Sequence, residues 1–104
     1  MQSGQLDKAV SLLVGACQPA KIILFGSFAK ETAKEDSDID LLIVMDEVKN
    51  KAQEIVRLNR LLSTLRMSVD LVIVDTKTFK YWSDTPGNVY YEAYSAGKTL
   101  YEAA

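Results

Sequence analysis

Hydrophobic residues recur along the chain in two patterns, one with the period of a helix and one with the length of a buried strand. Helices are predicted at about residues 6–17, 27–33, 47–65, 76–82 and 88–96. Strands are predicted at about residues 21–25, 38–44, 69–74 and 98–101. Pro19 blocks the first helix, Pro86-Gly87 marks a turn, and Gly97 is expected to stop the last helix. The pattern therefore predicts a fold that mixes helices and strands throughout.

The most informative stretch joins the first two predicted strands. Gly26-Ser27 follows the apolar run that ends at Phe25, and Asp38 and Asp40 come at the start of the next one. Side chains alternate along a strand, so both aspartates point to one face, where they repel unless a cation lies between them. Gly26 lets an anion approach the backbone, and Ser27 can begin a helix whose free N–H groups face phosphate. Because Mg²⁺ prefers carboxylates together with substrate phosphates, this stretch predicts chemistry on a nucleotide.

That prediction constrains the topology of the sheet. If Gly26 and the aspartates share one site, the first two strands most simply run antiparallel. The helix predicted at 47–65 is long enough to carry the chain back, so the third strand runs parallel to the second. Asp70 then lies near the start of its strand and can meet the other two carboxylates. It also interrupts an apolar run, where a carboxylate needs a metal or a hydrogen-bond donor. The predicted class is α+β, with a mixed sheet of three to four strands packed with helices.

Length and composition narrow the range of functions. The 104 residues predict a single domain, residues 1–104, and 48% hydrophobic with 25% charged residues is ordinary for a soluble protein. A net charge of −2 argues against a nucleic-acid partner, and the sequence shows neither a membrane span nor a signal pattern, so a cytoplasmic location is expected. The absence of histidine excludes Ser-His-Asp and Cys-His catalysis. Cys17 lies at helical spacing behind Leu13, which predicts a buried thiol and not a nucleophile.

Two motifs give the chain a resemblance to a known family. Gly26-Ser27-x-Ala29-Lys30, followed by Ser37-Asp38-Ile39-Asp40-Leu41, resembles the minimal nucleotidyltransferases of the DNA polymerase beta superfamily. Those domains carry GSxA[RK]G, then SDxDL, then a third aspartate on a later strand, to which Asp70 corresponds. Residues 97–102 also resemble the family's last strand, so the likeness covers nearly the whole chain. Glu31 stands where the family has glycine, which costs about 1 kcal/mol if that position needs a left-handed backbone.

The resemblance implies an enzyme that uses ATP and two Mg²⁺ ions to transfer AMP to a hydroxyl group. It implies that three aspartates bind the metals and carry catalysis, and that three other residues bind the nucleotide: Asp38, Asp40 and Asp70, then Gly26, Ser27 and Lys30. Minimal domains of this kind are often antitoxins, which silence a HEPN-type toxin by adding AMP to a tyrosine, and homo-oligomers are possible.

Two alternatives stay open beside that reading. One is a non-catalytic binding module that only occludes its partner. The other is an aminoglycoside-type transferase, although those enzymes carry an additional helical domain. Aromatic residues are concentrated after residue 78. Because a core of this size does not need them all, we expect some of them to form a surface for a protein partner.

Overall fold

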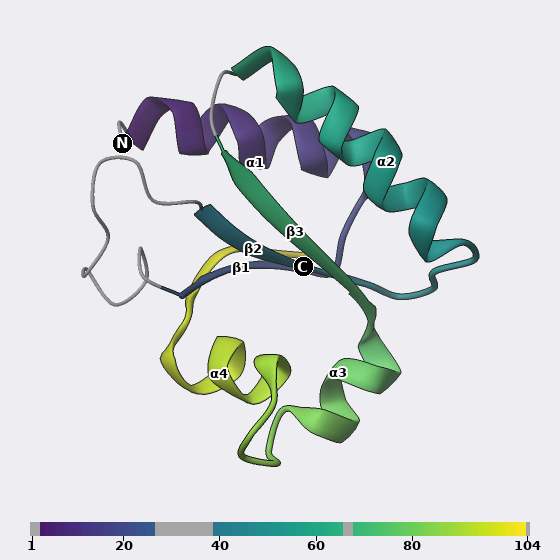
Figure 1. Ribbon diagram of the computed structural model, residues 1–104, viewed down its shortest axis with the longest axis vertical. Coiled ribbons are helices and arrows are strands. Elements are labelled where there is room, and N and C mark those ends of the chain that lie inside the picture. The colour runs from purple at the N-terminus through teal and green to yellow at the C-terminus, as the bar shows by residue number, and fades with distance from the viewer. Residues whose placement is uncertain (1–2, 27–38, 66–67, 104) are drawn as a thin grey trace.

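The computed structural model describes residues 3–26, 39–65 and 68–103 and shows three layers (Figure 1). A mixed sheet of four strands lies in the middle, with α1 and α2 on one face and α3 and α4 on the other. The elements run in the order α1 (Ser3–Cys17), β1 (Lys21–Phe25), β2 (Ile39–Met45), α2 (Lys51–Leu62), the 3₁₀ helix η1 (Ser63–Leu65), β3 (Val69–Asp75), α3 (Thr76–Trp82), α4 (Val89–Ala96) and β4 (Lys98–Glu102). The α+β prediction is confirmed, while the helix predicted at 27–33 lies outside the described residues.

The order of the strands is β3-β2-β1-β4. β1 and β2 are antiparallel, with Phe25 opposite Asp40 and Lys21 opposite Val44. β2 and β3 are parallel, as predicted from the return of the chain through α2. β4 pairs antiparallel with β1 and forms one edge of the sheet. The end of β1 and the starts of β2 and β3 therefore meet at the same end of the sheet.

Alternation along the strands divides the core into two parts. On the α1 and α2 side the buried residues are Ala9, Leu13, Ile22, Leu24, Ile39, Leu41, Ile43, Leu58, Leu62 and Ile73. On the α3 and α4 side they are Ile23, Phe25, Leu42, Val44, Val74, Phe79 and Ala93. The sheet is thus apolar on both faces, and each face is covered by a pair of helices. None of the described helices is long and apolar enough to cross a membrane.

The helix predicted at 47–65 is shorter than expected at both ends. Asn50 is its N-cap, because its side chain accepts a hydrogen bond from the Gln53 backbone N–H at 3.1 Å. Val48 nevertheless packs against the core from the preceding loop, so the helical spacing of apolar residues begins before the helix itself does. After Leu62 the chain tightens into the 3₁₀ helix η1. Apolar spacing alone thus overestimated the length of this helix.

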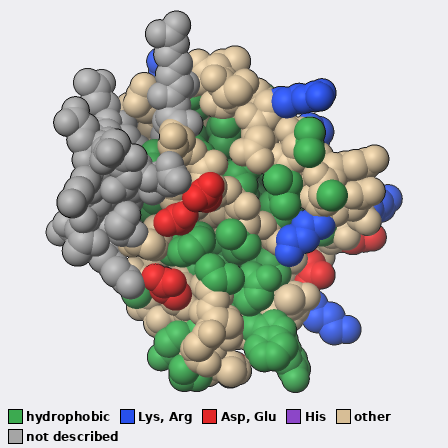
Figure 2. All heavy atoms as spheres, viewed as in Figure 1, with side chains coloured by type: hydrophobic (Ala, Val, Ile, Leu, Met, Phe, Trp, Pro, Cys, Tyr) green, Lys and Arg blue, Asp and Glu red, His purple; other side chains and the backbone are tan. Residues whose placement is uncertain are grey.

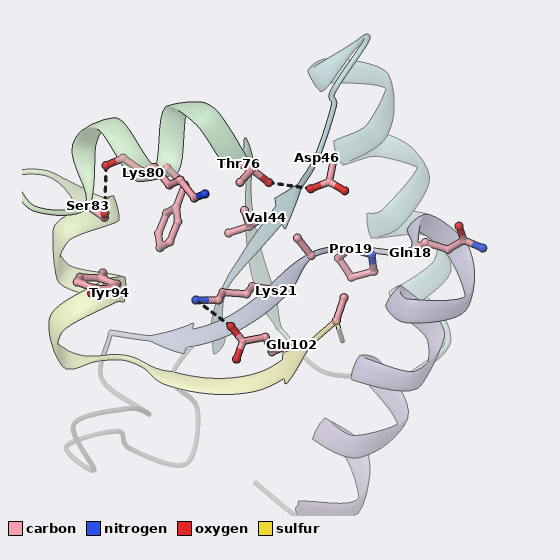
Figure 3. A pocket seen from close by; sticks show the side chains of 13 residues that line it. Gln18, Pro19, Lys21, Val44, Asp46, Thr76, Lys80, Ser83, Tyr94 and Glu102 are labelled. Carbon is pink, nitrogen blue, oxygen red and sulfur yellow. Dashed lines mark hydrogen bonds and ion pairs between the residues drawn. The ribbon is translucent and has the colours of Figure 1, made fainter.

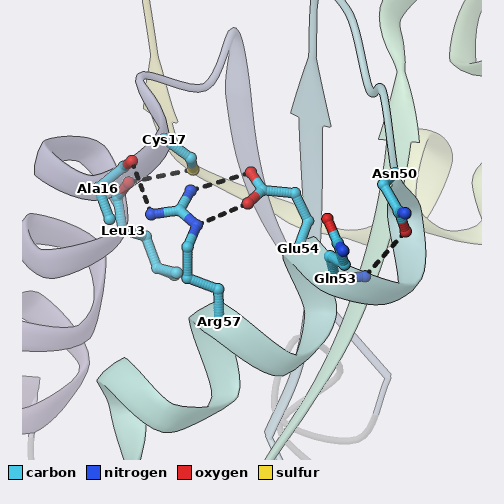
Figure 4. Close-up of polar contacts among 7 residues, drawn as sticks. All are labelled: Leu13, Ala16, Cys17, Asn50, Gln53, Glu54 and Arg57. Carbon is cyan, nitrogen blue, oxygen red and sulfur yellow. Dashed lines mark hydrogen bonds and ion pairs between the residues drawn. The ribbon is translucent and has the colours of Figure 1, made fainter.

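Arg57 links α1 and α2, the two helices that cover one face of the sheet (Figure 4). The guanidinium of Arg57 on α2 donates a hydrogen bond to the Ala16 carbonyl of α1 at 3.1 Å. It also binds Glu54 in two hydrogen bonds of 2.6 and 2.9 Å, which hold the pKa of that carboxyl below its ordinary value. In the same region the Cys17 thiol donates to the Leu13 carbonyl at 3.1 Å. The cysteine thus packs partly buried against the core.

Gly97 ends α4 as predicted, but its role is to make room for the sheet. Its φ of −80° lies outside the left-handed region, so any residue could adopt this backbone. A Cβ atom here would, however, lie 2.7 Å from Ile23 Cγ2 and 2.9 Å from the Leu24 carbonyl oxygen, and it would also meet the Ala93 carbonyl. The glycine therefore permits the close packing of α4 on β1.

Candidate functional site

Gly26 has two structural reasons to be a glycine. It directly follows β1 with a φ of +75°, in the left-handed region that glycine adopts at little cost. A Cβ atom at this position would also collide with the carboxylate of Asp40, whose Cγ lies only 3.2 Å from where that atom would be. The missing side chain therefore provides the space into which the Asp40 carboxylate fits. This contact joins the end of β1 to the start of β2.

Asp40 and Asp70 are direct partners in the parallel register of β2 and β3. Adjacent strands lie about 4.8 Å apart, and residues paired in this way point to the same face. That face is the one covered by α3 and α4, because Leu42 and Val44 follow Asp40 on it and Val74 follows Asp70. The two carboxylates therefore lie side by side at the end of the sheet where Gly26 is found. A shared cation would relieve their repulsion.

The expected environment of Asp70 needs a correction. Its apolar neighbours in sequence suggested a buried carboxylate that requires a metal or a donor. In the structure β3 is an edge strand and Asp70 is exposed. Water can therefore hydrate this carboxylate, and the apolar run gives no argument for a metal. The case for Asp70 rests on its position beside Asp40, which is half-buried.

The other three predicted site residues lie outside the described residues. Ser27, Lys30 and Asp38 fall within positions 27–38, as does Glu31 in place of the family glycine. Among the described residues no group of three or more His, Cys, Asp or Glu side chains could hold a metal ion. Asp40 and Asp70 supply two carboxylates, and Mg²⁺ is commonly bound by one or two carboxylates together with phosphates and water. The roles of these three residues stay predictions from the sequence.

Acidic and hydrophobic side chains lie next to one another on one face of the molecule. Figure 2 shows acidic side chains beside a hydrophobic area on the face that carries β3. The one thiol lies elsewhere, at the end of α1, and burial raises its pKa above the ordinary value. A raised pKa leaves less of the reactive thiolate at neutral pH, which agrees with the prediction that Cys17 is no nucleophile. The end of the sheet that carries Asp40 and Asp70 offers carboxylate oxygens, which are suitable ligands for a hard cation such as Mg²⁺.

Part of the aromatic C-terminal segment is exposed. Tyr81, Trp82 and Tyr94 on α3 and α4 are 69%, 42% and 61% exposed. Tyr81 and Trp82 pack edge to face with ring centroids 4.9 Å apart. Phe79, by contrast, is buried and belongs to the core. The predicted division between core and surface aromatics is thus present, whereas the partner of the exposed rings stays a prediction.

The fold and the paired aspartates define a class of protein, and a comparison with family models identifies the same class. Residues 7–104 match the family model described as Polymerase beta, Nucleotidyltransferase. The chain therefore belongs to the polymerase beta nucleotidyltransferase family. The sequence motifs at Gly26 and Asp38 predicted this membership, which is confirmed.

Three solved structures with a similar fold are toxin–antitoxin complexes. A chain of a toxin–antitoxin structure with AMP-PNP is 24% identical, with a TM-score of 0.67, over 93% of this chain and 73% of that one. A chain of the MntA–HepT toxin–antitoxin structure is 22% identical, with a TM-score of 0.64, over 98% and 74%. A chain from the complex of the tri-AMPylated Shewanella oneidensis HEPN toxin with its MNT antitoxin is 23% identical, with a TM-score of 0.63, over 99% and 74%. At these identities the likeness establishes the fold. No curated protein matches the chain.

Proposed function

We propose that this chain is a Mg²⁺-dependent adenylyltransferase that moves AMP from ATP to a tyrosine hydroxyl of a HEPN-type toxin. One observation carries the proposal: Asp40 and Asp70 are register partners at the end of the sheet where Gly26 provides space for the Asp40 carboxylate. The family membership supports nucleotidyl transfer. The similar fold in a complex of an AMPylated HEPN toxin with its antitoxin supports AMP as the group and the toxin as the acceptor.

In this proposal Asp40 and Asp70, with Asp38 of the motif, would hold two Mg²⁺ ions. When bound, the metals neutralise the charge of the triphosphate and of the transition state. The backbone of Gly26, with Ser27 and Lys30 of the same motif, would bind the phosphates, and Asp70 helps to accept the proton of the attacking hydroxyl. The hydroxyl oxygen attacks the α-phosphorus, and pyrophosphate leaves as the bond to the α-phosphoryl group breaks. Such catalysis depends mainly on positioning and charge neutralisation.

The alternative is a binding module that occludes the toxin without modifying it. The exposed Tyr81, Trp82 and Tyr94 favour a protein-binding surface, and such a surface would serve either function. The two functions predict different effects of neutralising Asp40 and Asp70. An enzyme loses its effect on the partner when the carboxylates are neutralised, whereas an occluding module keeps it.

The experiment uses ATP labelled on its α-phosphate, Mg²⁺ and a HEPN-type partner that carries a tyrosine acceptor. The partner should gain the mass of AMP with the wild type. Asp40→Asn and Asp70→Asn should each slow this transfer by roughly a hundredfold or more, because each removes charge that stabilises the transition state. Asp84→Asn, in the exposed turn after α3, is the matched control and should transfer normally. An unmodified partner that wild type and both variants neutralise equally would refute the enzyme and support the binding module.

A further inference from the structure

The outer side of β3 presents backbone groups that no strand among the described residues pairs with. β3 pairs with β2 on one side only, because it is the first strand of the sheet order. The Ile39 N–H donates to the Ser68 carbonyl at 2.9 Å, so in this parallel ladder Ser68 and every second residue after it bond to β2. The N–H and C=O groups of Val69, Leu71 and Ile73 therefore point outward. They form a row of donors and acceptors along the open edge.

The β3 edge lacks the features that protect the other edge of the sheet. Short length, a bulge and charged residues keep edge strands from pairing with other chains. β4 has all three, with five residues, a register shift that leaves Leu100 unmatched, and Lys98 and Glu102 at its ends. β3 is longer, with seven residues, pairs without a shift and contains neither proline nor lysine. Leu71 and Val72 in its middle are only half-buried, so β3 is the edge open to another strand.

A second copy of β3 fits this edge when the two strands run antiparallel about a two-fold axis at Val72. Residues with outward backbone groups must face each other, so Leu71 faces Ile73 of the second copy and Val72 faces its own equivalent. Each aspartate of β3 then lies opposite a valine, and no two carboxylates face each other. Only a register shifted by one residue would place Asp70 opposite Asp75, and that register leaves the outward groups unmatched.

The charges along β3 favour the same antiparallel arrangement. Hydrogen bonds from Thr78, and then the charges of Lys77 and Lys51, lower the pKa of Asp75, so both lysines lie near the end of β3. The carboxylates at this end, Asp75 and Asp46, each accept a hydrogen bond from a threonine of α3. Figure 2 shows hydrophobic side chains in the middle of the face that carries β3, with acidic ones on their left and a mixture of basic and acidic ones on their right. An antiparallel pair brings the lysine-bearing end of each copy to the start of the other copy's strand, where the exposed aspartate lies.

We propose that two copies of this chain associate through their β3 edges and join their four-stranded sheets into one continuous sheet. The outward groups of Val69, Leu71 and Ile73 bond to those of the second copy, and the apolar middle of each strand leaves water. The interface is isologous, since the same residues contribute from both copies. It requires neither ATP nor a metal ion, and it is independent of the proposed adenylyl transfer.

The first test is sedimentation equilibrium at increasing protein concentration. The mass should rise from 11.6 kDa toward twice that value. Val72→Lys should weaken the dimer by roughly tenfold or more, because it places two like charges opposite each other at the centre of the interface. Thr99→Lys, at an exposed position of the β4 edge, is the matched control and should leave the dimer unchanged. Asp40→Asn should dimerise like the wild type, so the proposed enzyme and the proposed dimer can fail separately. A mass of one copy at every concentration would overturn the proposal.

The second test is cross-linking in a Cys17→Ser background. Val72→Cys should form a disulfide-linked dimer under mild oxidation, because residues that face each other without mutual backbone bonds have Cα atoms about 4.5 Å apart, within the range of a disulfide. Thr99→Cys in the same background is the control and should stay monomeric on a denaturing gel. Equal cross-linking of the two variants would contradict pairing through β3.

The third test uses the unmodified chain and therefore does not depend on whether a variant folds. Amide hydrogen exchange at Val69, Leu71 and Ile73 should slow as the protein concentration rises, since their N–H groups become bonded only in the dimer. The amides of Val72 and Val74 bond to β2 in either state and should be protected at every concentration. Exchange at Val69 and Leu71 that does not change with concentration, in a sample that sediments as a dimer, would place the interface elsewhere and refute the proposal.

Discussion

Replacement of Gly26 by alanine should destabilise the fold in two ways, by backbone strain and by a steric collision of the new Cβ atom. The first is backbone strain, since a φ of +75° costs an L-residue about 1–2 kcal/mol. The second is steric, because the new Cβ would lie within 3.2 Å of Asp40 Cγ and collide with the carboxylate oxygen beyond it. Forcing a half-buried side chain aside typically costs a further 1–3 kcal/mol. We therefore expect Gly26→Ala to lower the free energy of unfolding by about 2–5 kcal/mol.

The measurement is urea denaturation of four variants at one pH. Gly87→Ala is the matched control, because Gly87 also has a positive φ, +98°, but a Cβ there meets nothing within 4 Å. It should show the strain without the collision. Asp40→Ala removes the carboxylate, so Gly26→Ala should cost less in that background than in the wild type. If Gly26→Ala costs no more than Gly87→Ala, and costs the same with either residue at position 40, the contact between Gly26 and Asp40 has no energetic role.

Two further predictions concern the packing of α4 on β1 and the N-cap of α3. Gly97→Ala should lower the free energy of unfolding by about 1–3 kcal/mol in the same urea assay, because the new Cβ crowds Ile23 and Leu24. Gly15→Ala is the control and should not destabilise, because a Cβ there meets nothing within 4 Å; equal effects of the two substitutions would contradict the packing argument. Hydrogen bonds from the side chain and backbone of Thr78 hold the pKa of Asp75, the N-cap of α3, below its ordinary value. The cap therefore stabilises the fold fully at a pH above the unfolded-state pKa of about 4, and this stabilisation is lost as the pH falls through the lower pKa of the folded state. Asp75→Asn keeps the cap but does not titrate, so its unfolding free energy should fall less steeply below pH 4 than that of the wild type; parallel curves would refute this.

The sheet topology could be predicted because a functional requirement was visible in the sequence. The need to bring Gly26, Asp40 and Asp70 together required antiparallel and then parallel pairing, and both are present. The errors came from properties that only the tertiary structure determines. Val48 contacts the core without being helical, so apolar spacing overextended α2. Asp70 lies in an apolar run but is exposed, because the position of β3 at the sheet edge depends on the whole strand order.

Other features could not be predicted because they combine distant segments. The end of α4 at Gly97 was predicted. The reason for a glycine there is the close approach of α4 to β1, which involves residues far apart in the chain. A cavity of about 540 Å³ draws its lining from the start of β1, the end of β2, α3, α4 and the end of β4 (Figure 3). None of these segments carries a motif by itself. Lys21 and Lys80 are ordinary charged residues until the fold brings them to one cavity.

The pairing of β4 with β1 has a consequence for how the chain behaves during synthesis. β1 is the strand KIILF, and four of its five residues are buried. Its second neighbour in the sheet is β4, which follows it by more than 70 positions. Until Lys98–Glu102 has emerged from the ribosome, one side of β1 keeps unpaired backbone groups along an apolar strand, which is a template for association with other chains. Premature termination before Lys98 would make that exposure permanent, so we expect truncated chains without β4 to aggregate more readily than the full chain.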